Sequence, residues 1–282
     1  PPRSTLSSSS AASDVYKRQG QIDDENFGVS GIEKSFDNYL KTNTKPLTIT
    51  LDKEIQFIIR QELRNFEKIF KNVGSAGILM NINSGEILSL ISLPDFDINK
   101  RKNISDKKYI NRATKGVYEF GSVFKTFTIA AGFDEKLIEP KDMFNNLEKK
   151  INCGGRTISE YDEDLSQNLS VEEILINSGN IGSVKIGQKL GVDKIKNFLD
   201  RIGIIGNIKF DITEIGTPIP FNWGKCKLLT VSFGHGITTT LIQLAKGYAI
   251  ISNGGYDPSL IHISEPTRRY AISYAVFCLK KK

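Results

Sequence analysis

The first compact pattern in the chain is an alternating run followed by a helical one. Residues 47–51 (LTITL) alternate apolar and polar side chains, as a short strand does. Apolar residues then recur every three or four positions over 53–70, and Asp52 stands just before this run, where its side chain suits a helix N-cap. The pattern predicts a strand and then an amphipathic helix whose apolar face lies against a core.

A hairpin and several helices are predicted further along. Two apolar runs, 76–82 and 86–91, flank Asn83-Ser84-Gly85, a composition typical of a hairpin turn, and Pro94 ends the second run. Helical periodicity returns over 122–137, 170–177, 181–190, 193–201 and 238–252. Early strands followed by mostly helices favour an α+β fold, and we expect part of its sheet to be missing because strand signals only resume near the end of the chain.

Charge is concentrated at the two ends of the chain. The 282 residues carry 38 basic and 32 acidic side chains, a net charge of +6. Removing 1–19 and 260–282 leaves 30 of each sign, so the body is neutral. A neutral body has no electrostatic footprint for nucleic acid, and its longest apolar stretches fall well short of the roughly 20 residues that a membrane helix needs.

Both ends also differ from the body in composition. Residues 1–19 are rich in serine without an apolar period, and 261–282 carry the string HISEPTRRYAISYAVFCLKKK from residue 262 onward. Both stretches resemble translated sequencing-adapter DNA, with a disordered tail as the alternative for the first. We therefore exclude both from the prediction of fold and function, and expect the true termini to lie elsewhere.

Most catalytic chemistries lack their residues in the body. Its one histidine, His235, lies between glycines and is predicted to be a turn residue, so neither a metal cluster nor a Ser-His-Asp triad has support. The Gly116 to Gly121 spacing fits a phosphate-binding loop, but no Lys-Ser/Thr pair follows. Cys153 and Cys226 have no metal-ligand spacing, and we expect two buried free thiols.

The remaining nucleophile pattern is Ser-x-x-Lys, in which both side chains share one helix face. It occurs at Ser105–Lys108, within a charged surface-like segment, and at Ser122–Lys125. Ser122 begins a largely apolar helix, where the helix dipole favours a developing negative charge and burial would lower the pKa of Lys125. From these residues alone, Ser122 is equally well interpreted as a nucleophile or as a helix N-cap.

The segment around Ser122, GVYEFGSVFKTFT, resembles the active-site segment of the penicillin-binding transpeptidases. Other segments resemble this family in the same order along the chain: GVSGIEKSFDNYL, LTITLDKEIQ, AGILMNINSGEILSLISLPDFDIN, NRATKGVYEFGSVFK, LSVEEILINSGNIGSVKIGQKLG, EIGTPIP and SFGHGITTTLIQLAKGYAIISNGG. The likeness spans about 20–259 and depends on the order of the motifs more than on any one of them. The chain is most similar to class B penicillin-binding proteins, and among these to the septal FtsI type.

The resemblance implies a fold in which helices flank an antiparallel sheet, and it assigns roles to four residues. Ser122 would be the acylated nucleophile, with Lys125 as its general base. Ser178 would relay a proton to the leaving amine, and Asn180 would hold the substrate amide. Without the resemblance, Ser178-Gly179-Asn180 is only a polar turn after a helical run.

The reaction that the resemblance implies is acyl transfer without a metal or cofactor. A peptidoglycan stem peptide ending in D-Ala-D-Ala acylates the serine, D-Ala leaves, and an amine of a neighbouring stem resolves the ester into a cross-link. β-Lactams mimic the dipeptide. Two other classes stay open: a serine β-lactamase or β-lactam sensor, and a catalytically degenerate scaffold in a cell-wall complex.

Three departures from the family pattern qualify this interpretation. Phe120 stands where proline usually precedes Gly-Ser, which predicts a looser approach to Ser122, and Thr240-Leu241 replaces the common Thr-Pro. No K-T-G or K-S-G motif occurs, although the family places one on a strand that supplies half of an oxyanion hole. We therefore expect the chain as written to be a truncated, inactive fragment.

The expected organisation is a partial transpeptidase domain over 47–260. It is preceded by an extended linker or the end of a non-catalytic region over 20–46, and flanked by the adapter-like tails 1–19 and 261–282. The resemblance implies a membrane-anchored parent whose domain lies in the periplasm or otherwise outside the cytoplasm. The implied partners are stem peptides, β-lactams, a glycan polymerase and division proteins.

Overall fold

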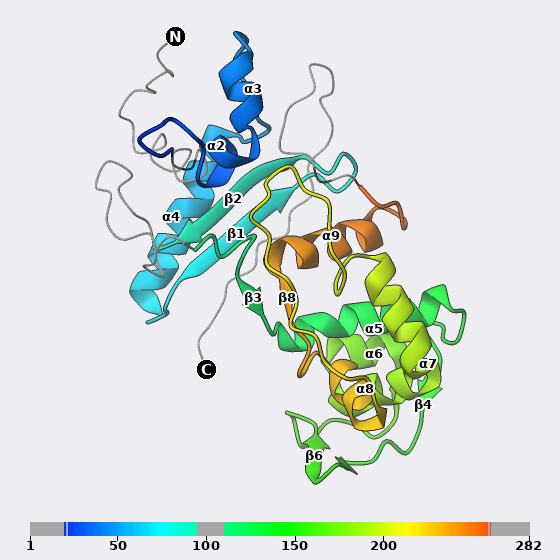
Figure 1. Cartoon of the computed structure of the whole chain (residues 1–282). Helices are drawn as coiled ribbons and strands as arrows, with labels where there is room; N and C mark the ends of the chain where they lie inside the picture. Colours follow the sequence, from blue (N-terminus) through cyan, green and yellow to red (C-terminus); the bar gives the residue numbers. More distant parts are fainter. Residues whose placement is uncertain (1–19, 21, 95–109, 259, 261–282) are drawn as a thin grey trace. The chain divides into compact units, whose positions relative to one another are not determined.

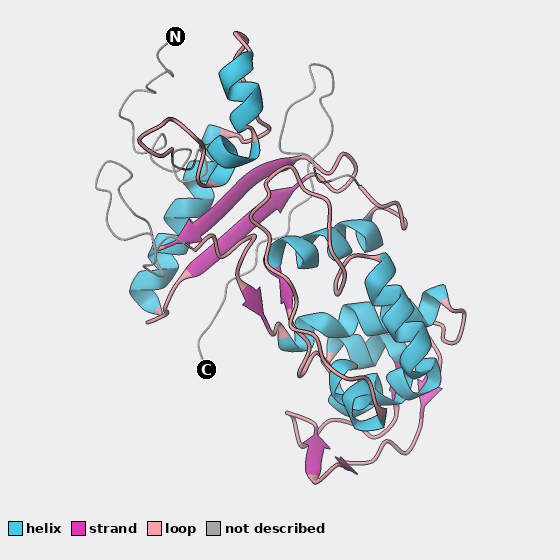
Figure 2. Ribbon diagram, in the orientation of Figure 1, coloured by secondary structure: helices cyan, strands magenta, loops and turns pink. Residues whose placement is uncertain are grey.

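The computed structural model describes residues 20, 22–94, 110–258 and 260, and these residues form two compact units (Figure 1). The first unit comprises the described parts of 1–117, 207–217 and 240–282, and the second comprises 118–206 and 218–239. Helices and strands occur in both (Figure 2), which confirms the predicted α+β class. The two short strands β3 (Val117–Tyr118) and β8 (Thr239–Thr240) lie where the chain passes between the units.

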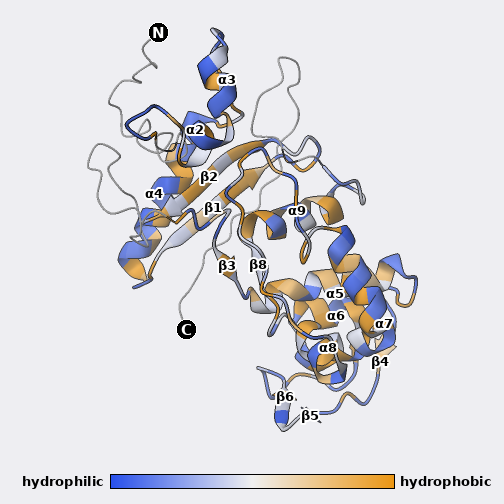
Figure 3. Ribbon diagram, in the orientation of Figure 1, coloured by the Kyte–Doolittle hydropathy of each residue, from blue (hydrophilic) through white to orange (hydrophobic). Residues whose placement is uncertain are grey.

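The first unit is built on a hairpin and the long helix α4. Strands β1 (Ser75–Met80) and β2 (Ile87–Leu93) pair antiparallel, and α4 (Lys53–Ile69) packs on both. The Asp52 carboxylate accepts the backbone N–H groups of Glu54 and Ile55, so the predicted N-cap is confirmed. The predicted hairpin is also confirmed, and Figure 3 shows the apolar character of these strands.

The outer edge of β2 is covered by polar groups that precede and begin α4. The buried Gln56 side chain donates to the carbonyl of Leu90 and accepts from its N–H, while the Asp52 N–H donates to the Leu88 carbonyl. These bonds satisfy an edge that would otherwise expose backbone donors and acceptors. Residues 47–51 do not form the predicted strand: only Ile49 has a β-bridge, because this segment bonds to β2 through single groups.

Helix α9 (Leu241–Ser252) completes the core of the first unit. It contacts β1, which is buried at every position, as expected for a strand covered on both faces. Thr240 and Gln243 form a capping box at its start, so the helix predicted over 238–252 is present with an ordered N-terminus. Two short helices, α2 (Gly31–Ser35) and α3 (Asp37–Thr42), occur where the sequence predicted extended chain.

The second unit is a group of helices around α7 (Asn180–Arg201). Helix α5 (Lys125–Asp134) and helix α8 (Lys225–Val231) pack on α7, and α6 (Val171–Ile176) precedes it. The core contains fully buried aromatic and aliphatic side chains, among them Phe124, Phe127, Ile174, Ile181 and Ile186. Gly191 has a non-helical backbone (φ 74°) inside α7, which matches the predicted break between two helical segments.

Short elements that the sequence did not reveal complete this unit. The 3₁₀ turn η2 (Gly121–Phe124) runs directly into α5. Two small antiparallel pairs, β4 (Met143–Phe144) with β7 (Leu169–Ser170) and β5 (Lys150–Cys153) with β6 (Arg156–Ser159), lie in the connection between α5 and α6. Strands of two to four residues carry too little alternation to be recognised from sequence.

Candidate active site

Ser122 and Lys125 lie in the second unit at the start of α5. Ser122 belongs to the 3₁₀ turn, its side chain is exposed, and its carbonyl accepts the N–H of Lys125. Lys125 begins the α-helix and is only 1% exposed. The chain therefore presents an exposed serine three residues before a buried lysine. Ser122 lies in the 3₁₀ turn, whereas the sequence predicted that it begins the α-helix itself.

Phe120 adopts a compact backbone conformation just before this turn. Its φ of −89° lies not far from the value that proline would impose, and its ring packs edge-on against Tyr118 with centroids 6.0 Å apart. An aromatic contact thus occurs where the family usually has proline, and the looser approach to Ser122 stays a prediction.

Lys125 contacts the second predicted motif through Ser178. Its Nζ donates to the Ser178 hydroxyl oxygen at 2.9 Å and also to the Ser178 carbonyl. Burial lowers the pKa of the Lys125 ammonium group from 10.5 to about 8, while the nearby Glu160 carboxylate acts in the opposite direction by favouring the charged form. An amine with this pKa is partly neutral near neutral pH and can accept a proton.

Ser178 occupies a backbone position that normally belongs to glycine. Its φ is +53°, and the chain reverses there after α6. Its N–H donates to the Leu175 carbonyl and the Gly179 N–H donates to the Ile174 carbonyl, which together form a Schellman C-cap. The motif turns the Ser178 hydroxyl toward Lys125 at the cost of left-handed backbone strain.

Asn180 begins α7, and two consecutive residues of the β5–β6 hairpin end hold it. Its side-chain Nδ2 donates to the Ser159 carbonyl at 2.8 Å. Its backbone N–H donates to Glu160 Oε2 at 2.5 Å, and the Ile181 N–H donates to Glu160 Oε1 at 2.7 Å. Glu160 could not be singled out from the sequence, because it begins a polar, acid-rich stretch typical of a solvated loop.

A glycine-containing turn after α8 packs closely against the turn that contains Ser122. A Cβ atom at Gly234 would lie 1.8 Å from the Gly121 carbonyl oxygen, and Gly234 has φ +85°. The preceding Ser232 carbonyl accepts from the buried Thr128 hydroxyl of α5 at 2.9 Å. The close approach and the positive φ both require glycine at position 234.

His235 lies in this same turn, as predicted. Its Nδ1 is 2.7 Å from Glu119 Oε1, and its ring stacks on Phe233 with centroids 6.1 Å apart. Within the described ranges, no group of His, Cys, Asp and Glu side chains is arranged to hold a metal ion, and no helix is long and apolar enough to cross a bilayer. The competing Ser105–Lys108 pair and the tails 1–19 and 261–282 lie outside the described residues.

The expectation of two buried free thiols is wrong. Cys153, at the end of β5, and Cys226, in the first turn of α8, form a disulfide, and both are only partly buried. Their separation of 73 residues gave no signal of pairing, because only the folded chain brings the hairpin to α8. The disulfide links the β5–β6 hairpin to α8, and Glu160 directly follows this hairpin.

These contacts combine an exposed hydroxyl, a buried amine of lowered pKa and a second hydroxyl that contacts this amine. A neutral amine can take the proton of a nearby serine hydroxyl, so that the oxygen attacks a carbonyl carbon. The second hydroxyl can pass a proton between the amine and a leaving group. Such a set is suited to acyl transfer without histidine.

Comparison with known proteins agrees with this chemistry. Residues 75–269 match the family model of the penicillin binding protein transpeptidase domain. The chain belongs to the penicillin-binding protein transpeptidase family. Its relatives place it among the class B members, since several of them are named FtsI or PenA.

Two curated relatives illustrate the similarity. The probable peptidoglycan D,D-transpeptidase FtsI of Caulobacter vibrioides is 30% identical over 241 residues, covering 84% of this chain and 41% of that protein. Stage V sporulation protein D of Bacillus subtilis is 30% identical over 223 residues, covering 74% and 33% respectively. This penicillin-binding protein chain thus spans less than half of the length of these two relatives.

Solved structures share its fold. Penicillin binding protein 3 of Mycobacterium tuberculosis complexed with ampicillin has a TM-score of 0.77 at 21% identity, covering 95% of this chain and 63% of that one. A peptidoglycan synthetase of Bifidobacterium adolescentis has a TM-score of 0.76 at 20% identity, covering 94% and 55%. These likenesses confirm the predicted transpeptidase fold.

Proposed function

We propose that this chain is the serine acyl-transfer region of a peptidoglycan D,D-transpeptidase. The observation that carries the proposal is the hydrogen bond of 2.9 Å from buried Lys125 to the Ser178 hydroxyl. Lys125 itself lies three residues after the exposed Ser122. The family membership and the names of the curated relatives support the same reaction.

In the proposed reaction, neutral Lys125 takes the hydroxyl proton as Ser122 Oγ bonds to the penultimate D-Ala carbonyl carbon of a stem peptide. The peptide bond to the terminal D-Ala then breaks, and Ser178 relays the proton from Lys125 to the leaving amine. An amine of a second stem then attacks the ester carbonyl carbon and gives up one proton to Lys125, which returns a proton to Ser122 Oγ as the ester bond breaks. The new amide bond is the cross-link. Asn180 holds the amide of the donor stem.

The proposed partners and place of action follow from the same reaction. The full-length protein takes stem peptides ending in D-Ala-D-Ala as substrates and β-lactams as inhibitors. One structural neighbour is described as complexed with ampicillin, which supports β-lactams as inhibitors. We place the domain outside the cytoplasm in a membrane-anchored parent, working with a glycan polymerase in septal wall synthesis; the Cys153–Cys226 disulfide supports an oxidising compartment.

Labelling with a fluorescent penicillin tests the proposal in the full-length protein. We expect a stable covalent adduct whose mass increase maps to the peptide containing Ser122, and none in Ser122→Ala. Ser84→Ala, which changes a serine of the β1–β2 turn, is the control and should label as wild type does. Labelling that survives in Ser122→Ala would refute the assignment.

The lifetime of the adduct separates the remaining classes. Slow release of penicilloate is expected for a transpeptidase, whereas a β-lactamase would release it rapidly. A full-length protein that forms no adduct at all would instead be a scaffold without acyl-transfer chemistry.

A further inference from the structure

The N-terminus of α7 receives its cap from another part of the chain. Its N-cap residue is Gly179, which has no side chain to accept the free N–H groups of the first turn. The Glu160 carboxylate accepts two of them, from Asn180 and Ile181, with one oxygen each. A carboxylate at a helix N-terminus is also stabilised by the helix dipole.

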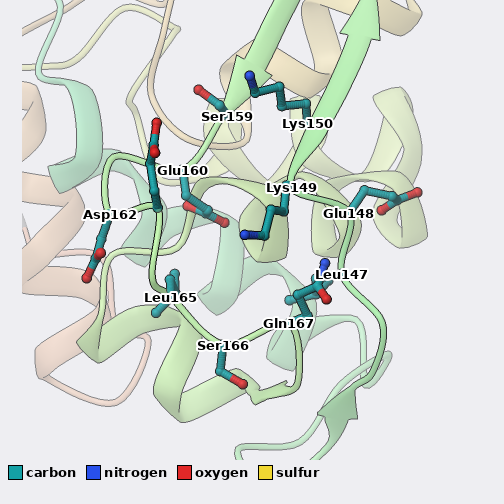
Figure 4. A pocket seen from close by; sticks show the side chains of 11 residues that line it. Leu147, Glu148, Lys149, Lys150, Ser159, Glu160, Asp162, Leu165, Ser166 and Gln167 are labelled. Atoms are coloured by element: carbon teal, nitrogen blue, oxygen red, sulfur yellow. The ribbon is translucent and has the colours of Figure 1, made fainter.

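The Glu160 carboxylate is held by the start of α7, and Glu160 also lines a pocket. Residues from 147–150 and 159–167 line this pocket, whose volume is about 190 Å³ (Figure 4). Glu160 is half-buried, and the N–H groups of Asn180 and Ile181 bind both oxygens of its carboxylate. A glutamine has nearly the same shape, so it removes the charge with little change in volume.

Ser159, the residue before Glu160, also binds Asn180, through its backbone carbonyl. The Ser159 carbonyl accepts Nδ2 of Asn180, so the hairpin end fixes both the backbone and the side chain of that residue. The hairpin is itself held by the β5–β6 ladder and by the disulfide to α8. The Ser178–Asn180 segment thus lies between the end of α6 and a braced carboxylate.

We propose that Glu160 is a positioning residue for acyl transfer, whose carboxylate holds the Ser178–Asn180 segment in the arrangement that contacts Lys125. This role rests on the proposed acylation of Ser122. Glu160 touches none of the reacting groups of the proposed reaction and acts through α7 and through its charge. Among the described residues, it is the charged group that acts on Lys125, where it opposes the effect of burial.

The test is the pH dependence of penicillin acylation in the full-length protein with Glu160→Gln and Glu160→Asp. Glu160→Gln removes the charge that favours protonated Lys125, so the acid limb of the rate should move to lower pH. Its maximal rate should fall by about 10-fold to 100-fold, since the Asn180 and Ile181 N–H groups lose their shared carboxylate. Glu160→Asp keeps the charge but shortens the reach, so it should lower the maximum without moving the limb.

Glu163→Gln is the matched control. Glu163 lines the same pocket and is exposed, and the substitution removes the same charge and adds the same amide. It should leave both the limb and the maximal rate as in wild type. Thermal unfolding of each variant, measured alongside, separates a loss of fold from a loss of rate.

Two outcomes overturn the inference. An unshifted acid limb in Glu160→Gln would reduce Glu160 to a structural cap, and a wild-type rate in both Glu160 variants would remove it from positioning. If Glu160→Gln does not fold, the rate of Glu160→Asp decides. A wild-type protein that is not labelled at Ser122 defeats the proposed function instead, which keeps the two failures distinct.

Discussion

The Nζ atom of Lys125 lies 2.9 Å from the hydroxyl oxygen of Ser178, although 53 residues separate them in the sequence. This contact joins the start of α5 to the end of α6 inside one compact unit. It gives the buried Lys125 amine a hydroxyl partner and brings the Ser178–Asn180 motif to the Ser122–Lys125 motif. The consequences for rate and stability can be measured separately.

Acylation by penicillin should rise with pH and reach half of its maximum near pH 8. Lys125 accepts a proton only when neutral, and burial lowers its pKa to about 8. Below this value the ammonium form dominates, so the rate should fall about tenfold for each pH unit. The measurement is the second-order rate constant of labelling between about pH 6 and about pH 9.

Two variants complete this measurement. Lys125→Ala should react slowly at every pH and lose the limb, because no amine titrates at that position. Lys141→Ala, which changes an exposed lysine, should keep the wild-type profile. A flat wild-type profile over the same range would show that Lys125 is not the base.

Ser178→Gly should be less active than wild type but more stable than Ser178→Ala. Ser178 has φ +53°, which glycine adopts without a steric penalty. Both variants lose the hydrogen bond from Lys125, so the glycine variant should be the more stable of the two by about 0.5–1 kcal/mol after the larger loss of backbone freedom in glycine. Acylation should fall sharply because the hydroxyl that contacts Lys125 is gone. Urea unfolding and labelling rates report the two effects.

Ser178→Ala is the control for this pair of effects. It also removes the hydroxyl but keeps a Cβ atom in the left-handed conformation, so activity should fall without a gain in stability. Equal stability of the glycine and alanine variants would mean that the backbone strain is not released at this position.

Features set by neighbouring residues were predictable from the sequence. Asp52 and the apolar period after it determine α4, and Asn83-Ser84-Gly85 between two apolar runs determines the β1–β2 hairpin. Ser122 and Lys125 lie one helical turn apart because of their spacing alone, and the Lys125 N–H donates to the Ser122 carbonyl. In each case the interacting groups lie within a few residues of one another.

Features that depend on distant pairing were not predictable. Glu160 is one of several acidic residues in its segment, and only the position of α7 in the fold distinguishes it from Glu163. Cys153 and Cys226 meet because the β5–β6 hairpin reaches α8. The predicted strand at 47–51 was wrong for a related reason, since its alternation is local but a strand needs a partner along its whole length.

Gly234→Ala should disrupt the turn that presents Ser122. The new Cβ would lie 1.8 Å from the Gly121 carbonyl oxygen, so the Ser122 turn must move. The protein should lose more than about 2 kcal/mol of stability, from the clash together with the left-handed strain. Labelling at Ser122 should fall strongly even under conditions where the variant stays folded.

Gly254→Ala separates the clash from the strain. Gly254 has φ +87°, close to the +85° of Gly234, but a Cβ there would meet nothing within 4 Å. It should cost only about 1–2 kcal/mol and leave the labelling rate unchanged. Equal effects of the two substitutions on labelling would exclude a specific role of the contact with Gly121.

Loss of the Cys153–Cys226 disulfide should weaken both the fold and the acylation rate. The bond closes a long loop between the β5–β6 hairpin and α8, and its removal by Cys226→Ser should cost about 2–4 kcal/mol. Because Glu160 directly follows the hairpin, its hold on Asn180 should loosen and the maximal rate should fall. Alkylation of the unreduced protein followed by peptide mass analysis should find Cys153 and Cys226 unmodified, whereas alkylation after reduction should modify both. Modification of both thiols without a reductant would contradict the pairing.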